Sequence, residues 1–154
     1  MDFIDSVFET AKKCRTETLF ILSGHWGRSL KASLSIACSK IHEELGIDVY
    51  ILDYFKAIPL EILESEHPKI EHAGETETSE VMALHPEMVE DVYKELKTNY
   101  PEPMPKCIYQ AFTKNDLKTL QYWGEPAKAS ADKGKIIIEK VTDALSETIK
   151  QKLK

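Results

Sequence analysis

The chain has 154 residues, a length at which one domain can bury about two-thirds of the surface of its unfolded chain around a single core. The 42% hydrophobic and 30% charged residues are typical of a globular protein and exclude disordered, collagen-like and disulfide-rich classes. The formal net charge of −6, without a stripe of Lys and Arg, argues against nucleic acid as a partner. We predict a single domain over residues 1–154.

Three cysteines, Cys14, Cys38 and Cys107, are widely spaced, odd in number and without a CxxC pair. This usage suits a reducing compartment better than a disulfide framework, so we expect a cytoplasmic protein. The N-terminal sequence lacks the basic and apolar regions of a signal peptide, and no run approaches the ~18 apolar residues of a membrane span. We therefore expect no membrane partner.

The first half of the chain alternates predicted helices and strands. Apolar residues recur at helical spacing from Phe3 to Ala11, and again from Arg28 to Leu45, where Gly46 follows as an expected helix end. A nearly continuous apolar run at residues 18–23 and a second apolar run at residues 49–52, within residues 47–55, are typical of buried parallel strands. Strand, helix and strand at this spacing predict an α/β fold, a parallel sheet with helices on both faces.

The second half is less regular. Residues 56–105 are richer in Pro, Glu and Thr, and a short helix is predicted only at residues 75–84, ended by His85 and Pro86. Apolar spacing from Pro126 to Lys154, with lysines at the end, predicts a long C-terminal helix. Irregular segments over a rigid sheet are common places for functional sites.

His25 follows the first predicted strand, in the turn Gly24-His25-Trp26-Gly27. Open parallel sheets bind ligands at the carboxyl ends of their strands, and glycines let the backbone approach a ligand closely. From the residues alone, His25 is either a ligand or catalytic residue, or a loop histidine without such a role. Because the turn has neither a GxGxxG nor a P-loop pattern, a nucleotide-binding module is a weaker alternative.

A second cluster places an imidazole near two carboxylates: His72, Glu75 and Glu77, with Gly74 permitting a sharp entry into the helix. Such a group could bind a metal or transfer a proton. The alternative is an ordinary helix start, because glutamates in the first turn and nearby Thr or Ser side chains are favourable for structural reasons. The residues alone leave both interpretations open.

Three segments resemble the creatininase family. Residues 72–89, HAGETETSEVMALHPEMV, are similar to its signature HAGxxETSxxLxLxPxxV. Residues 23–29 resemble its NGHGGN turn, and residues 122–134 resemble its closing GxxGxPxxAxxxxG segment. Since all three follow the family order, the resemblance covers essentially the whole chain and implies a three-layer α/β/α sandwich with a mostly parallel sheet.

The resemblance also implies an activity: hydrolysis of C–N bonds in cyclic or linear amides, with two divalent metal ions, usually zinc or manganese, and a homo-oligomeric assembly. A metal lowers the pKa of bound water and polarises the carbonyl, while an imidazole or carboxylate moves the proton to the leaving nitrogen. The resemblance assigns His25 and Glu75 as metal ligands, His72 and Glu77 as catalytic residues, and Gly24, Trp26 and Gly74 to the substrate pocket.

The family's other metal ligands lie in an N-terminal segment with a Glu-x-His-Gly motif and a later aspartate, which has no counterpart in this sequence. A catalytic zinc normally has three protein ligands, so His25 and Glu75 alone would hold a metal weakly or not at all. A complementary N-terminal chain, a rearranged homo-oligomer, or the rest of a longer protein of which this sequence is a fragment would each complete the site and cover the exposed sheet edge. The alternative function is a non-catalytic binding or assembly subunit that retains the fold.

Overall fold

The computed structural model describes residues 3–25, 27–69, 71–100 and 122–153, so Trp26 and Cys107 lie outside the described residues. The chain forms two compact units. The first unit comprises the residues up to Ala57 together with those from Val141 onward, and the second comprises Ile58–Lys140. The long helix α5 (Ala131–Lys152) contributes residues to both units.

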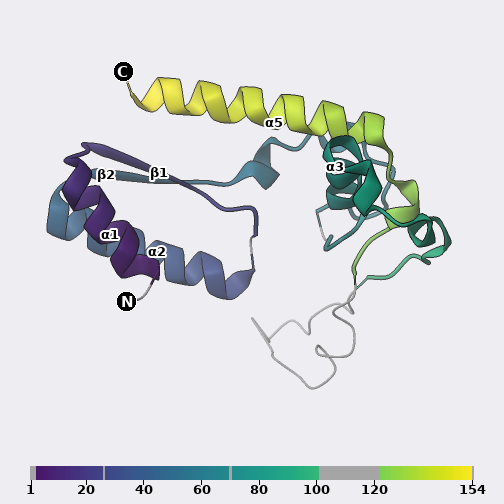
Figure 1. Cartoon of the computed structure of the whole chain (residues 1–154), viewed down its shortest axis with the longest axis horizontal. Helices are drawn as coiled ribbons and strands as arrows, with labels where there is room; N and C mark the ends of the chain where they lie inside the picture. The colour runs from purple at the N-terminus through teal and green to yellow at the C-terminus, as the bar shows by residue number, and fades with distance from the viewer. Residues whose placement is uncertain (1–2, 26, 70, 101–121, 154) are drawn as a thin grey trace. The chain divides into compact units, whose positions relative to one another are not determined.

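The first unit contains a βαβ unit preceded by a helix (Figure 1). Its elements are α1 (Phe3–Cys14), β1 (Thr18–Leu22), α2 (Arg28–Leu45) and β2 (Asp48–Leu52). The two strands are parallel, with Thr18 opposite Asp48 and Leu22 opposite Leu52. The predicted α/β class and the order of elements are confirmed.

The second predicted strand is confirmed, because β2 contains the apolar run at residues 49–52. β2 ends at Leu52, and Tyr54–Ala57 form a 3-10 turn, η1. The backbone N–H of Lys56 donates to the carbonyl oxygen of Asp53 at 3.2 Å, so the chain turns directly after the strand.

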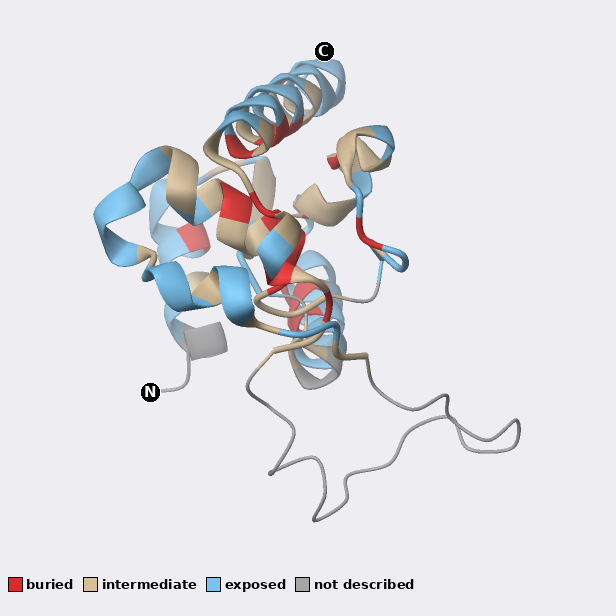
Figure 2. Ribbon diagram, turned by 90° about the vertical axis from the view of Figure 1, so that its right-hand side faces the viewer, coloured by how far each residue is buried: buried red, intermediate tan, exposed pale blue. Residues whose placement is uncertain are grey.

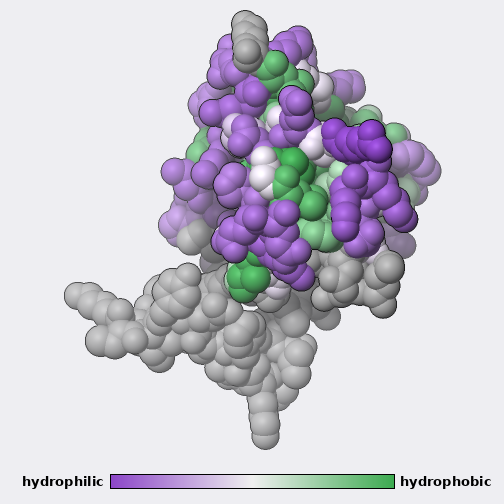
Figure 3. All heavy atoms as spheres, turned by 90° about the vertical axis from the view of Figure 1, so that its left-hand side faces the viewer, coloured by the Kyte–Doolittle hydropathy of each residue, from purple (hydrophilic) through white to green (hydrophobic). Residues whose placement is uncertain are grey.

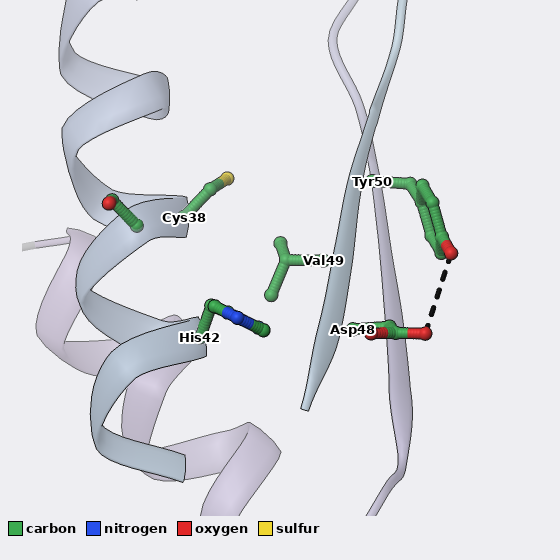
Figure 4. A pocket seen from close by; sticks show the side chains of 6 residues that line it. Cys38, His42, Asp48, Val49 and Tyr50 are labelled. Atoms are coloured by element: carbon green, nitrogen blue, oxygen red, sulfur yellow. Dashed lines mark hydrogen bonds between the residues drawn. The ribbon is translucent and has the colours of Figure 1, made fainter. Parts of the chain in front are cut away.

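Helices lie on both faces of the sheet in the first unit. Val49 points towards α2, whereas Tyr50 emerges from the opposite face (Figure 4). There Tyr50 stacks on Phe20, with ring centroids 5.3 Å apart, and the Lys152 ammonium of α5 lies 5.4 Å from its ring. The buried apolar residues of this unit are Ala11, Leu34, Ala37, Cys38, Ile41, Leu52 and Val141.

Apolar side chains also reach the surface of this unit. Leu22 at the end of β1 and Ile36 on α2 are 57% and 71% exposed. Figure 3 shows a hydrophobic area surrounded by hydrophilic residues. Within the described part of the chain, β1 and β2 pair only with each other, which leaves one edge of each strand without a strand partner.

The second unit is built on α3 (Glu75–Leu84) and the first turns of α5. The α3 bounds agree with the prediction. The expected helix from Pro126 begins later, because Pro126–Lys128 form a separate 3-10 turn, η5, and Ala129 is extended. The other 3-10 turns of this unit are η2 (Leu60–Ile62), η3 (Pro86–Met88) and η4 (Asp91–Glu95).

Gly134 and Ile137 pack α5 into the second unit. Ile137 is fully buried, and the buried positions of α5 lie on one side of the helix (Figure 2). A Cβ atom on Gly134 would overlap the backbone carbonyl of Ser79 on α3, so the two helices touch through their backbones. In the described ranges, no helix has the length and apolar character needed to cross a membrane.

Candidate functional site

His25 lies in the loop after β1, in the first unit. Its backbone N–H donates to Ser23 Oγ at 3.2 Å, and Ser23 Oγ donates to the His25 carbonyl oxygen at 2.7 Å. The exposed imidazole folds over Gly27, where a Cβ atom would lie 2.5 Å from Nε2. The local sequence therefore holds His25 at the carboxyl edge of the sheet, as predicted, with Gly24 exposed beside it.

The other predicted catalytic residues lie in the second unit, before and within the first turn of α3. The backbone of His72 pairs with Trp123 through bonds of 3.0 and 2.7 Å, and their rings meet edge to face at 6.1 Å. His72 Nδ1 lies 4.0 Å from Glu77 Oε2, and Glu77 also accepts the N–H of Ala73. Both side chains remain partly exposed, at 42% and 33%. The structure brings His72 and Glu77 together at an accessible position.

Gly74 begins α3 where two other parts of the chain approach closely. A Cβ atom there would lie 2.8 Å from the Trp123 carbonyl oxygen and 2.9 Å from Glu71 Cδ. The preceding residue, Ala73, has a φ of 50°, which is uncommon for a residue other than glycine. Gly74 therefore permits the close packing of the His72 segment against Trp123.

Glu71, which no sequence pattern singled out, caps α3. Its carboxylate accepts the backbone N–H groups of Glu75 and Thr76, both at 3.1 Å, and the hydroxyls of Thr76 at 2.7 Å and Ser65 at 2.8 Å. A carboxylate at a helix N-terminus is favourable because it meets unpaired N–H groups and the positive end of the helix dipole. Sequence rules look for a capping side chain directly before the helix, so Glu71 gave no signal.

Glu75, the other predicted metal ligand, is completely buried in the second unit. Its carboxylate accepts the backbone N–H of Glu64 at 2.9 and 3.0 Å, the N–H of Ser65 at 2.7 Å, and the Lys133 ammonium. Burial alone would raise the pKa of Glu75, but these hydrogen bonds, led by that of Lys133, outweigh it and lower the pKa. The carboxylate is ionised and surrounded by donors.

The implied metal ions are not matched by the residues that the structure describes. Within these ranges, no group of three or more His, Cys, Asp or Glu side chains is arranged to hold a metal ion. His25 belongs to the first unit and Glu75 to the second, and Glu75 already bonds to an ammonium and two backbone N–H groups. The described residues do not fit a divalent metal by themselves.

Glu80, one helical turn after Glu77, is a second residue that the sequence analysis missed. Burial, followed by the charge of Glu77, raises the pKa of Glu80 to about 7.

The charged side chains around Glu80 are paired with other residues. Lys128 is paired with Glu125, and Lys133 is paired with Glu64 and Glu75. On the neighbouring η3, Glu87 is hydrogen-bonded to His85. Among the described residues, Glu80 therefore has no hydrogen bond or ion pair to stabilise its charge.

This pKa predicts a loss of stability as the pH rises towards neutrality. The folded-state pKa of Glu80 lies above its ordinary value of 4.5. The contribution of the protonated side chain to the free energy of unfolding is therefore complete below pH 4.5 and is lost as the pH rises through about 7. We expect the free energy of unfolding in urea to fall by about 2 kcal/mol between about pH 5 and about pH 8, allowing for partial exposure. Glu80→Gln should remove most of this fall. An equal fall in both proteins would contradict the prediction.

A cavity of about 310 Å³ lies elsewhere, in the first unit. Its lining includes Cys38 and His42 of α2 and Asp48 and Tyr50 of β2 (Figure 4). His42 Nδ1 lies 2.7 Å from the Ile47 carbonyl oxygen, and burial raises the pKa of the Cys38 thiol, which makes it less reactive. Because the cavity adjoins the start of β2, it is distinct from the carboxyl edge that carries His25.

Comparisons with known proteins agree with this architecture. The family model "Creatininase: Creatinine amidohydrolase" matches residues 1–149. A search of the curated proteins found no match.

Three solved structures are similar: a tryptophan-to-phenylalanine mutant creatininase, a glutamate-to-glutamine mutant creatininase described as Zn-Zn type, and creatinine amidohydrolase (creatininase). All three have a TM-score of 0.70, with 22%, 21% and 22% identity respectively. The match covers 97% of this chain but 61% of each structure, so the chain spans less than two-thirds of their length. These likenesses confirm the fold, and the family model shows that the chain belongs to the creatininase family.

Proposed function

We propose that this chain forms the substrate-side part of a creatininase-type amidohydrolase, which hydrolyses the C–N bond of a small cyclic or linear amide. The observation that carries the proposal is the His72 and Glu77 pair, held beside Trp123 in the segment most similar to the family signature. An accessible imidazole with a neighbouring carboxylate is suited to moving a proton during hydrolysis.

In this proposal, Glu77 orients the imidazole of His72. The carboxylate lies on the Nδ1 side of the ring at 4.0 Å, and it is held in place by the N–H of Ala73. Nε2 then exchanges the proton with the attacking water and the leaving nitrogen. Separations of this kind often shorten when the substrate binds. The edge of Trp123 supplies an apolar wall beside the imidazole.

Metal ions are part of the proposal only by similarity. One similar creatininase is described as Zn-Zn type. By analogy, we propose zinc or manganese for the complete enzyme, with His25 as one candidate ligand. The remaining ligands would come from residues outside this sequence or from another copy in a homo-oligomer.

Substitutions at the pair test the proposed chemistry. Using hydrolysis of creatinine and related cyclic amides in the presence of zinc or manganese, we expect His72→Ala to lower kcat by roughly 10²- to 10⁴-fold. Glu77→Gln should lower kcat less, because the amide keeps the shape of the side chain that orients the imidazole. Circular dichroism of each variant checks that the fold is retained.

His85→Ala is the matched control, because His85 is also exposed and also paired with a glutamate, at the opposite end of α3. Its rate should equal that of the unmodified protein. Equal activity of the His72→Ala variant would refute the role of His72. Absence of hydrolysis by the unmodified protein with either metal would reject the arrangement in which copies of this chain supply the remaining metal ligands to one another.

The buried Glu75 and Lys133 contact favours a second candidate, a non-catalytic binding or assembly subunit that keeps the fold. Metal content after dialysis distinguishes the two candidates. Zinc or manganese that is retained near stoichiometry and lost in His25→Ala would favour the enzyme. A metal-free, stable homo-oligomer without amidase activity would favour the subunit.

A further inference from the structure

Lys133 occupies the centre of a cluster of oxygen atoms in the second unit. Its ammonium donates to Glu75 Oε1, to Glu64 Oε1 at 2.7 Å and to the Lys128 carbonyl oxygen at 2.8 Å. These three acceptors use all three N–H bonds of the ammonium. Two carboxylates and a carbonyl around one cation form the kind of oxygen set that also suits a hard metal ion.

The two central charges of the cluster are buried. The Glu75 side chain has no exposed surface, and that of Lys133 is 15% exposed, whereas that of Glu64 is 67% exposed. Three acceptors around Nζ match the three N–H bonds of a protonated lysine, so a largely buried positive charge lies against a buried negative charge.

The acceptor capacity of Glu75 is also used. Oε1 accepts from Lys133 and from the Glu64 N–H, while Oε2 accepts from the N–H groups of Glu64 and Ser65. A metal ion bound there would have to displace the ammonium and would separate it from its only fully buried carboxylate among the described residues, which is unfavourable. It would also weaken the hydrogen bonds of the two N–H groups.

We infer that the Lys133 ammonium is the cation of this oxygen cluster and that it keeps Glu75 from coordinating a metal ion. Lys133 is then a positioning residue. Through Glu75 it ties residues 64–65 and the start of α5 to the first turn of α3, the turn that also carries Glu77. This inference does not depend on amide hydrolysis by the chain.

Manganese relaxation of NMR signals tests the inference on the unmodified protein. Mn²⁺ broadens the amide signals of residues near its binding site, so substoichiometric Mn²⁺ is added at neutral pH while the amides of residues 64, 65, 75 and 133 are monitored. We expect these signals to stay as sharp as in a sample with the same amount of Mg²⁺. Selective broadening of these four signals would overturn the inference.

Lys133→Met supplies the complementary test, because it removes the ammonium while preserving much of the side-chain volume. We expect the folded variant to show selective Mn²⁺ broadening at residues 64, 65 and 75, since the oxygen cluster is left without its cation. A folded variant that shows no broadening would refute the role of the ammonium as a substitute for a metal ion. Lys135→Met, at an exposed position two residues later, is the matched control and should behave as the unmodified protein.

These outcomes are separate from those of the amidohydrolase proposal. An inactive protein whose Glu75 region stays sharp with Mn²⁺ would reject hydrolysis and support the inference. An active protein with Mn²⁺ bound at Glu75 would support hydrolysis and overturn the inference. If Lys133→Met does not fold, the measurement on the unmodified protein still decides the question.

Discussion

Gly134→Ala is expected to lower the midpoint of thermal unfolding by about 5–10 °C, equivalent to about 2–3 kcal/mol. The added methyl would overlap the carbonyl oxygen of Ser79 and would lie 2.5 Å from its carbonyl carbon and 2.8 Å from Ala83 Cβ. Since two of these atoms belong to the backbone of α3, a rotamer change cannot relieve the overlap. The helices must move apart, and the higher helix propensity of alanine, worth ~1 kcal/mol, offsets only part of this cost.

Gly24→Ala is the matched control for this prediction. An added Cβ atom at Gly24 meets no atom within 4 Å, so the unfolding midpoint should change little. Circular dichroism and the fluorescence of Trp123, which lies in the same unit as Gly134, follow the transition. A Gly134→Ala protein at least as stable as the unmodified one would show that α3 and α5 do not pack as described.

The elements that were predicted best have end signals within their own sequence. α2 agrees with its predicted bounds because Gly46 takes a left-handed conformation, with a φ of 66°, and its N–H donates to the His42 carbonyl oxygen. α3 agrees because His85 and Pro86 end it. The start of α5 differs from the prediction because the 3-10 turn η5 and the extended Ala129 interrupt an otherwise regular pattern there.

The candidate site likewise has one part that the local sequence could suggest and another part that it could not. His72 and Glu77 are close in sequence, so the turn into α3 brings them together, and the sequence could suggest this pair. The contact between Glu75 and Lys133 joins residues that are 58 positions apart, and no spacing rule reveals it. The raised pKa of Glu80 depends on burial by the folded protein, which the sequence does not show. Long-range contacts therefore decide whether a glutamate of the motif is available to a ligand.

Glu75→Ala is expected to destabilise the protein by about 3–5 kcal/mol, the largest effect of any substitution considered. It removes the buried acceptor of Lys133 and leaves the N–H groups of Glu64 and Ser65 without their partner. Glu75→Gln should cost less, because its amide oxygen can still accept one or both N–H groups. Urea unfolding at neutral pH measures both costs.

Glu64→Gln is the control that separates burial from charge. It removes a carboxylate from the same ammonium, but this carboxylate is 67% exposed, so its loss should cost below about 1 kcal/mol.

The lowered pKa of Glu75 adds a second signature. The contribution of the Glu75 carboxylate to the free energy of unfolding is present above pH 4.5 and is lost as the pH falls below that value. The Glu75→Gln protein should lack this acid dependence. If Glu75→Ala and Glu64→Gln cost the same, the buried ion pair is not what holds the N-terminus of α3, and Glu75 becomes available again as a metal ligand.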